Sequence, residues 1–474
     1  MEAGTARAGM DRGTVMALVA MALGVFLIAN DFTALSVAIP EIERDLDTSL
    51  AKAQWVINGY AVVFGVLIVT GGRLADLFGR KHVFMIGATI FGVFSLLGGI
   101  APNIETLVAC RALMGIGGAM VWPAVLGMTY AILPEEKAGL AGGLILGVAG
   151  LGNAVGPLLG GVLTELLSWR WVFIVNLPIT VFAMVVTQRQ VAETRGDTAE
   201  RKIDYRGILT LSGGVVALLV ALDQGTETGF GDPPILALFA VGAALLVVFA
   251  FVELRQGPSA LVPRSVLENR EFMAAAVAVL AMSAIFFSAL LYLPQFMEKV
   301  LGFSAIEAGA GLLPVMAVFA ASSFTAGPLY DRLGARLVVG AGAVCLGLGM
   351  FVLSFLDEGS SYASLVPGMI ILGLGVGLFY SSITTAGVTA LDPSQTSLAG
   401  GIIYMCQIAG GSLGLGLNTA IVLTGSGLAD GIRTAFRVDA ALAVFGLVIV
   451  LLFIGRSEPA THRLQLRNHH RAHA

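Results

Sequence analysis

Long apolar segments alternate with short polar connections along nearly the whole chain. An apolar run of about 20 residues is long enough to cross the hydrocarbon core of a bilayer as a helix. The pattern predicts fourteen membrane-spanning helices. They cover residues 14–38, 55–72, 82–100, 104–130, 138–163, 171–189, 206–222, 235–252, 272–293, 308–328, 336–355, 364–388, 396–423 and 435–455.

Two polar segments divide these spans into groups of six, two and six. We therefore predict an all-α polytopic membrane protein, with two six-helix bundles and two additional helices between them. A twelve-span alternative would leave 206–222 and 235–252 outside the bilayer, which their apolarity disfavours. The predicted order is an N-terminal segment 1–13, a first bundle 14–190, a linker 191–205, the additional helices 206–252, a second linker 253–271, a second bundle 272–455 and a tail 456–474.

Composition supports this class. The 474 residues are 57% hydrophobic and 12% charged, and the mean hydropathy is +0.89. The net charge of −4 offers no case for a nucleic-acid partner. Three cysteines stand singly in separate apolar segments, which is typical of neither a disulfide framework nor a metal site. We expect a lipid bilayer as the environment, and neither a metal nor a cofactor.

The basic residues predict the orientation. With an even number of spans, most of the 27 lysines and arginines fall on the side that holds both termini. Positive charge marks cytoplasmic loops, so both termini are expected in the cytoplasm. The first apolar run is too long for a signal peptide and contains Asp31, so it is interpreted as the first span.

Two connections repeat each other at equivalent places in the two bundles. Residues 71–81 read GGRLADLFGRK after the second span, and residues 326–336 read AGPLYDRLGAR after the tenth. Similar halves with a substrate site between them are a known transporter plan. The matching pairs are Gly72 and Gly327, Leu74 and Leu329, Asp76 and Asp331, Gly79 and Gly334, and Lys81 and Arg336.

The fifth span carries an ordered set of glycines. Gly152, Gly156 and Gly160 recur every four residues and so share one helical face. Such a face lets two membrane helices approach closely, and Pro157 bends the helix. We expect this span to pack against a helix of the other half and to seal one end of a pathway. The full set is Gly143, Gly152, Gly156, Pro157, Gly160 and Gly161.

Together these motifs resemble the major facilitator superfamily, and more narrowly its fourteen-span drug:proton antiporter family of bacteria. Residues 72–81 match the cytoplasmic loop motif except at Leu77, where a basic residue is usual, and the fifth span matches the antiporter motif. Residues 31–40 resemble the first-span motif with Ser36 in place of Asn. Residues 111–117 resemble the fourth-span motif with Met114 in place of Gln. The resemblance covers nearly the whole chain.

Asp31 and Arg111 are the candidates for proton coupling. Asp31 is an acid inside an apolar span, where burial disfavours its charge and where a change of protonation is what coupling requires. Arg111 retains its charge and needs a carboxylate, carbonyl groups or water. The resemblance implies that Arg111 assists proton transfer. A direct pair between the two is one possible arrangement.

The repeated connections are expected to form a gate. An acid at the rim favours the positive N-terminus of a helix from the other half, and residues 392–395 are typical of such an N-terminus. These contacts would hold the outward-facing state and break as the halves rock. The gate residues are Gly72, Asp76, Gly79, Arg80, Lys81, Asp331 and Arg332.

Polar and aromatic residues inside the spans are candidates for a substrate cavity, although contacts between helices explain each of them equally well. The main set is Asn58, Tyr60, Phe286, Phe287, Tyr380, Tyr404 and Gln407. Further polar candidates are Gln54, Gln295 and Asn418, and further apolar ones are Trp122 and Phe324. Glu165 and Asp223 are expected near the outer interface.

The predicted function is export of amphipathic or cationic organic compounds in exchange for protons, by a monomer in the bacterial plasma membrane. The alternative is a proton-coupled exporter of one metabolite, antibiotic or lipid. The antiporter glycines disfavour an importer. An enzyme or sensor would need a catalytic constellation or a signalling domain, and neither is evident in the sequence.

Overall fold

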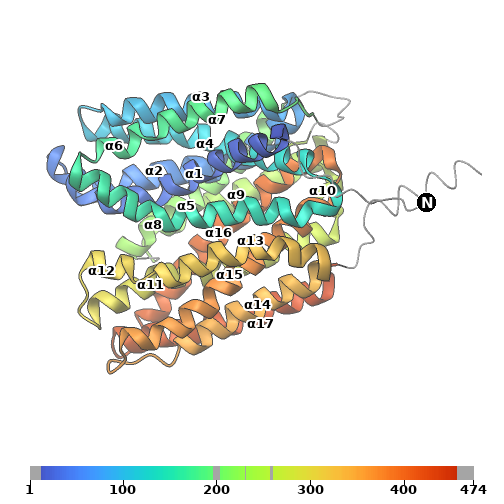
Figure 1. Ribbon diagram of the computed structural model, residues 1–474. Helices are drawn as coiled ribbons and strands as arrows, with labels where there is room; N and C mark the ends of the chain where they lie inside the picture. Colours follow the sequence, from blue (N-terminus) through green and yellow to red (C-terminus); the bar gives the residue numbers. More distant parts are fainter. Residues whose placement is uncertain (1–11, 196–202, 230, 257–259, 456–474) are drawn as a thin grey trace, which may run out of the picture.

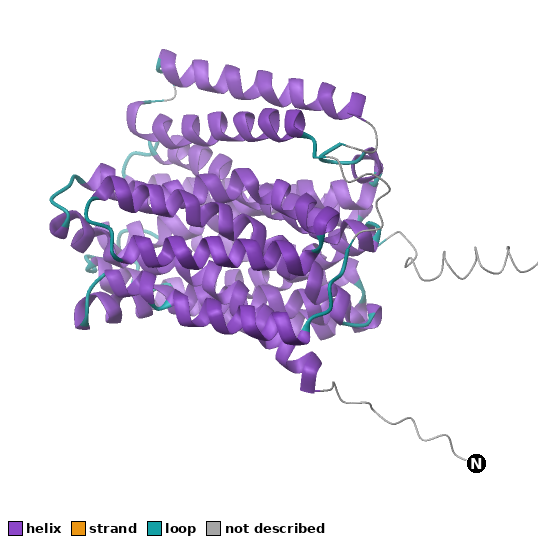
Figure 2. Cartoon of the chain, turned by 90° about the horizontal axis from the view of Figure 1, so that it is seen from above, coloured by secondary structure: helices purple, strands orange, loops and turns teal. Residues whose placement is uncertain are grey.

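The computed structural model describes residues 12–195, 203–229, 231–256 and 260–455, and within these ranges the chain is helical, with no strand (Figure 2). The helices are α1 (Arg12–Asp45), α2 (Leu50–Phe78), α3 (Arg80–Gly99), α4 (Ile104–Ile132), α5 (Ala138–Leu166), α6 (Arg170–Ile174), α7 (Asn176–Gln190), α8 (Tyr205–Thr228), α9 (Pro233–Gln256), α10 (Arg264–Glu268), α11 (Arg270–Lys299), α12 (Ala305–Ala310), α13 (Leu313–Leu333), α14 (Ala335–Leu353), α15 (Tyr362–Ala390), α16 (Thr396–Val422) and α17 (Leu428–Phe453). Short 3-10 helices cover Glu135–Lys137 and Pro393–Gln395.

The predicted all-α polytopic class is confirmed. In the described residues, 13 helical segments are long and apolar enough to cross a bilayer, and α8 adds the shorter apolar stretch Tyr205–Ala221. The predicted count of fourteen spans is compatible with this set.

The two halves have the same internal arrangement. In the first half, α1 packs against α5 and α7, and α2 packs against α4. In the second half, α11 packs against α16 and α17, and α13 packs against α15. The two groups lie side by side with their helices roughly parallel, the blue-to-green half next to the yellow-to-red half (Figure 1).

Two equivalent contacts join the halves. The second span of each half packs against the fifth span of the other, α2 on α16 and α13 on α5. Since α2 and α13 also carry most of the repeated connections, those two motifs lie near the surface where the halves meet.

The helices α8 and α9 form a hairpin beside this surface. They pack against each other, and α8 also contacts α2 and α16. Only 11% of the most apolar part of α9 is buried by protein, although this helix has the highest hydropathy of the spans found in the described residues. Such a surface suits contact with lipid. Asp204 begins the hairpin by accepting a hydrogen bond from the Gly207 N–H at 2.8 Å, which caps α8.

Some boundaries differ from the sequence-based prediction. The segments 71–81 and 326–336 are mostly helical, because α2 continues to Phe78 and α13 to Leu333, each followed by one glycine before the next helix starts. The predicted sixth span is split into α6 and α7. Pro178 provides the reason, since a proline lacks the N–H that would continue the helix from Ile174.

Candidate functional site

A buried ion pair lies inside the first half. The Nη1 of Arg111 on α4 donates to Oδ2 of Asp31 on α1, and neither side chain is exposed to solvent. Leaving one member of a buried pair alone costs about 3–5 kcal/mol, so each charge depends on the other. The pairing that the sequence left open is thus present in this conformation.

Three further helices contribute to this site. The Nε of Arg111 donates to the Val56 carbonyl of α2 at 2.7 Å, and the guanidinium lies over the Tyr60 ring at 4.3 Å from its centroid. Asn176 of α7 reaches Oδ1 of Asp31 at 3.5 Å and also donates to the Ser95 hydroxyl of α3 at 3.1 Å. The pair and the residues bonded around it thus come from five helices.

Sequence reasoning missed Asn176 and Ser95. Both are polar residues inside predicted spans, and this position could have marked them as candidates for a buried polar site. Of the two residues that depart from the family motifs, one contacts the ion pair and the other bonds within its own helix. Met114 lies beside Arg111, with its sulfur 3.8 Å from Nη1. Ser36 turns to its own helix and donates to the Thr33 carbonyl at 2.7 Å.

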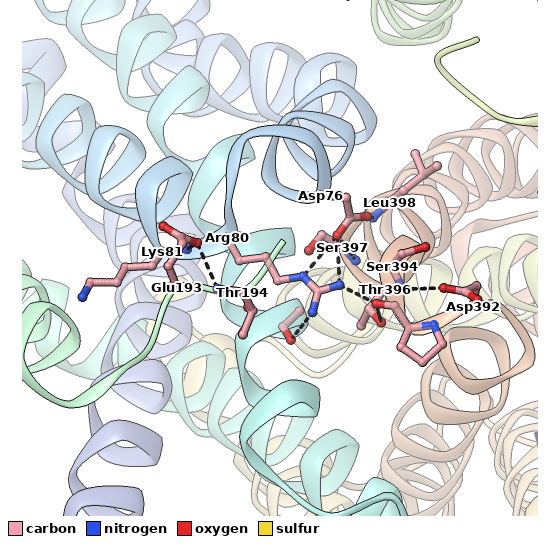
Figure 3. Close-up of polar contacts among 12 residues, drawn as sticks. Asp76, Arg80, Lys81, Glu193, Thr194, Asp392, Ser394, Thr396, Ser397 and Leu398 are labelled. Atoms are coloured by element: carbon pink, nitrogen blue, oxygen red, sulfur yellow. Dashed lines mark hydrogen bonds and ion pairs between the residues drawn. The ribbon is translucent and has the colours of Figure 1, made fainter. Parts of the chain in front are cut away.

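Asp76 is buried where the two halves meet, at the end of the molecule that carries the repeated connections. Its Oδ2 accepts from the Leu398 N–H at 2.9 Å and its Oδ1 from the Ser397 N–H at 3.3 Å (Figure 3). These are free N–H groups of the first turn of α16, where a negative charge is favoured. Asp76 therefore lies at the helix N-terminus expected from the sequence.

Arg80 completes this contact. Its Nε and Nη2 lie 3.2 and 3.1 Å from Oδ1 of Asp76, its Nη1 donates to the Gly127 carbonyl at 3.2 Å, and its Nη2 donates to the Pro393 carbonyl at 2.6 Å (Figure 3). Arg80 is 4% exposed. One guanidinium thus connects α2, α4 and the segment that precedes α16.

Asp331 makes the equivalent contact in the reverse direction. Its Oδ1 accepts from the Gly139 N–H, in the first turn of α5, at 2.8 Å. Unlike Asp76, it is exposed, and so is the adjacent Arg332. The gate contact is therefore double, with one buried and one exposed carboxylate.

Lys81 bonds to the end of α7, and single glycines form the turns in both repeated connections. The Nζ of Lys81 donates to the carbonyls of Gln188 and Val191 at 2.9 and 3.0 Å, at the end of α7. Gly79 and Gly334 both adopt a positive φ, 113° and 84°, which lets each pair of helices turn within a single residue. Gly72 faces the main chain of Ser397 and has no room for a side chain.

The glycines of α5 form two faces, which corrects one expectation. Gly143 lies against the main chain of α13 in the other half, as expected. Gly152, Gly156 and Gly160 lie instead against residues 26–34 of α1, in their own half. The difference arises because α5 lies between α1 and α13, so that the four-residue repeat faces only one of its neighbours. Gly161 has room for a Cβ beside Val37, and Pro157 is partly buried.

The cavity candidates divide between the halves. Tyr60 packs with Phe32 and Phe64, and Tyr404 of α16 contacts Phe64 and Trp122 across the junction of the halves. In the second half, Phe286 lies near Phe287 and Tyr380, and the Tyr380 hydroxyl lies 2.8 Å from that of Ser283. Asn58 and Gln407 are half-buried, whereas Gln54 is exposed.

Two other residues singled out in the sequence lie outside this aromatic surface. Asn418 is fully buried and bonded to Asp439, so it lines no cavity in this conformation. Glu165 is exposed near the end of α5. The side chain of Asp223 lies outside those that the structure describes.

Comparisons with known proteins agree with this architecture. The family model described as Major Facilitator Superfamily matches residues 21–415 and 311–473. Two curated relatives align over almost the whole chain. The puromycin resistance protein pur8 of Streptomyces alboniger is 33% identical over 94% of this chain and 89% of its own. The cephamycin export protein CmcT of Amycolatopsis lactamdurans is 32% identical over 94% and 93%.

A solved structure, the human organic anion transporter MFSD10 (TETRAN), matches 92% of this chain and 99% of its own with a TM-score of 0.67. At 12% identity this likeness concerns the fold alone. The length and identity of the family and relative matches, on a molecule with two equivalent helical halves, lead to one conclusion: the chain belongs to the Major Facilitator Superfamily.

Proposed function

We propose that this protein exports amphipathic or cationic organic compounds in exchange for protons across the bacterial plasma membrane. The named relatives that support export include resistance and export proteins for puromycin, tetracenomycin C and cephamycin, as well as multidrug resistance proteins. The protein works as a monomer, with both termini in the cytoplasm.

The observation that carries the proposal is the buried pair of Asp31 and Arg111. A carboxylate that takes up a proton releases its guanidinium partner, so protonation and the packing of α1 against α4 are linked. The Tyr60 ring, which the Arg111 guanidinium covers, packs with Phe32 and Phe64, and Phe64 contacts Tyr404 across the junction of the halves. A cationic or aromatic substrate is suited to such a surface.

Alternating access requires the halves to separate at one end. In this conformation they are joined by Asp76, Arg80 and Asp331 at the end with the repeated connections. We assign this end to the cytoplasm and the conformation to a state closed on that side. Opening it would break hydrogen bonds at two helix N-termini while the helices themselves move as rigid units.

The test is transport by purified protein in liposomes with an imposed pH gradient, with tetraphenylphosphonium as the probe. Wild type should accumulate the cation when the gradient is present, and Asp31→Asn should lose gradient-driven uptake while its folding is checked by gel filtration. Glu43→Gln, a change on the same helix, is the matched control and should transport normally. Full gradient-driven uptake by Asp31→Asn would remove Asp31 from the coupling role.

The alternative function is export of one antibiotic or metabolite. It is favoured by the relatives named for single antibiotics. Competition by a panel of unrelated compounds distinguishes the two. Inhibition by many cations of different shape indicates a multidrug exporter, and inhibition by one chemical class indicates a specific one.

A further inference from the structure

We propose that Asp439, together with Asn418 and Ser288, forms a second proton-binding site in the second half of the protein. The site lies between α11, α16 and α17, away from Asp31. The site would add a second group to the proposed proton coupling. Its role in transport rests on that proposed function, whereas proton binding by Asp439 can be tested without it.

Asp439 is deeply buried and incompletely bonded. The residue is 1% exposed and lies about three turns into α17. Its Oδ1 accepts from Nδ2 of Asn418 at 3.0 Å, whereas its Oδ2 is buried without a hydrogen-bond partner. The Ser288 hydroxyl adjoins the carboxyl group from α11. One carboxyl oxygen is thus available to carry a proton.

The comparison with Asp31 shows what Asp439 lacks. Both acids lie where the first and sixth spans of a half pack together, α1 with α7 and α11 with α17. Asp31 has the guanidinium of Arg111, but no basic side chain of the described chain forms an ion pair with Asp439. An ionised carboxylate buried without a cation is very costly, so the neutral, protonated form is the stable one here.

The neighbouring helices supply few other charges. On α11, Tyr292 is the titratable group facing the site, and its hydroxyl lies 2.8 Å from that of Thr419. The helix α16 contains no acidic or basic residue. On α14, Cys345 is half-buried, and the sole charged residue, Arg336, stands in the first turn.

The charged residues on α17 itself point elsewhere. Asp430 is paired with Arg433 at 3.0 Å in the first turns of the helix. Arg437 is exposed, two residues and so about 200° around the helix from Asp439. Neither arginine therefore neutralises the buried carboxyl group.

The packing favours a proton over a larger ligand. The side chains of Asp439, Asn418 and Ser288 are at most 1% exposed. The main contacts of α17 are with α11, α14 and α16, all in its own half, so the site does not face the junction of the halves. A proton, unlike a larger ligand, needs no cavity.

Infrared spectroscopy tests the site without any transport. Wild-type protein at neutral pH should show a protonated-carboxyl C=O band that decreases as the pH rises. Asp439→Asn should lack this band, and the matched control Asp430→Asn on the same helix should keep it. A band of equal intensity in wild type and Asp439→Asn would overturn the proposal.

A second variant covers the case in which Asp439→Asn does not fold. Asn418→Ala keeps the acid and removes its hydrogen-bond donor, so the band should persist at a shifted frequency. An unchanged frequency would contradict the assigned contact and thus the site.

The role in coupling is measured in liposomes as the number of protons exchanged per tetraphenylphosphonium ion, obtained from the gradient at which net flux reverses. Asp439→Asn should exchange one proton fewer than wild type, and Asp430→Asn the same number. An unchanged number in Asp439→Asn overturns a coupled site. Absence of any proton coupling in wild type would refute the proposed function, while the infrared band would still decide whether Asp439 binds a proton.

Discussion

Asp76 and Asp331 make the same contact in opposite directions. Each stands near the end of the second span of its half and accepts a hydrogen bond from main-chain N–H groups at the start of the fifth span of the other half. The two halves are thereby joined at one end by two interactions of the same kind. The buried member, Asp76, also bonds with Arg80, whereas Asp331 is exposed.

This difference predicts unequal effects of neutralising the two acids. Asp76→Asn should open this end more than Asp331→Asn, because it leaves the buried Arg80 without its carboxylate. A hydrogen bond to a charged group contributes about 1.5–3 kcal/mol. The measurement is the distance between spin labels at Glu136 and Arg332, one on each half, in a background without native cysteines.

The expected result is a longer distance in Asp76→Asn and a smaller increase in Asp331→Asn. Glu358→Gln, an exposed acid between α14 and α15, is the control and should leave the distance unchanged. Equal distances in wild type and Asp76→Asn would show that this contact does not hold the halves together.

The bonds of Arg80 lead us to expect that a positive charge alone does not hold the halves together at this contact. Its guanidinium donates to Asp76, Gly127 and Pro393 at the same time. A lysine presents a single ammonium group and lacks the planar fork, so Arg80→Lys should restore only part of these bonds. We expect its transport to resemble that of Arg80→Ala more than that of wild type. Transport at the wild-type rate by Arg80→Lys would mean that the bonds to Gly127 and Pro393 have no role.

Alanine substitutions at the adjacent positions Gly160 and Gly161 should affect stability differently. A Cβ at Gly160 would overlap the main chain of Ala34 on α1, whereas a Cβ at Gly161 meets only a Val37 methyl group at 3.6 Å. Gly160→Ala should therefore lower the stability by about 1–3 kcal/mol through overpacking. Gly161→Ala should be neutral or slightly stabilising, because alanine favours a helix over glycine. Thermal unfolding in detergent measures both, and similar midpoints for the two variants would contradict the close packing of α5 on α1.

The amino-acid sequence by itself determined the class of the protein and the presence of two similar halves, and it predicted a number of spans that is compatible with the structure. Apolar runs long enough for a bilayer have no stable alternative to helices in lipid, so this information is local and can be read without a structure. The repeat of Asp76 and Asp331 at equal spacing likewise identified the acids at the junction.

The tertiary structure alone decided which side chains meet. The sequence indicated that Asp31 and Arg111 are buried charges, but their pairing depends on how α1 and α4 cross. The contact of the α5 glycines with α1 likewise depends on how these two helices pack. Asp439 stands close to Arg433 and Arg437 in the sequence, and this local pattern does not distinguish a buried acid from an interfacial one. Only the rotation of α17 shows that the acid points inward and the exposed arginine outward. Helix rotation and crossing arise from packing between distant segments, and no local pattern determines them.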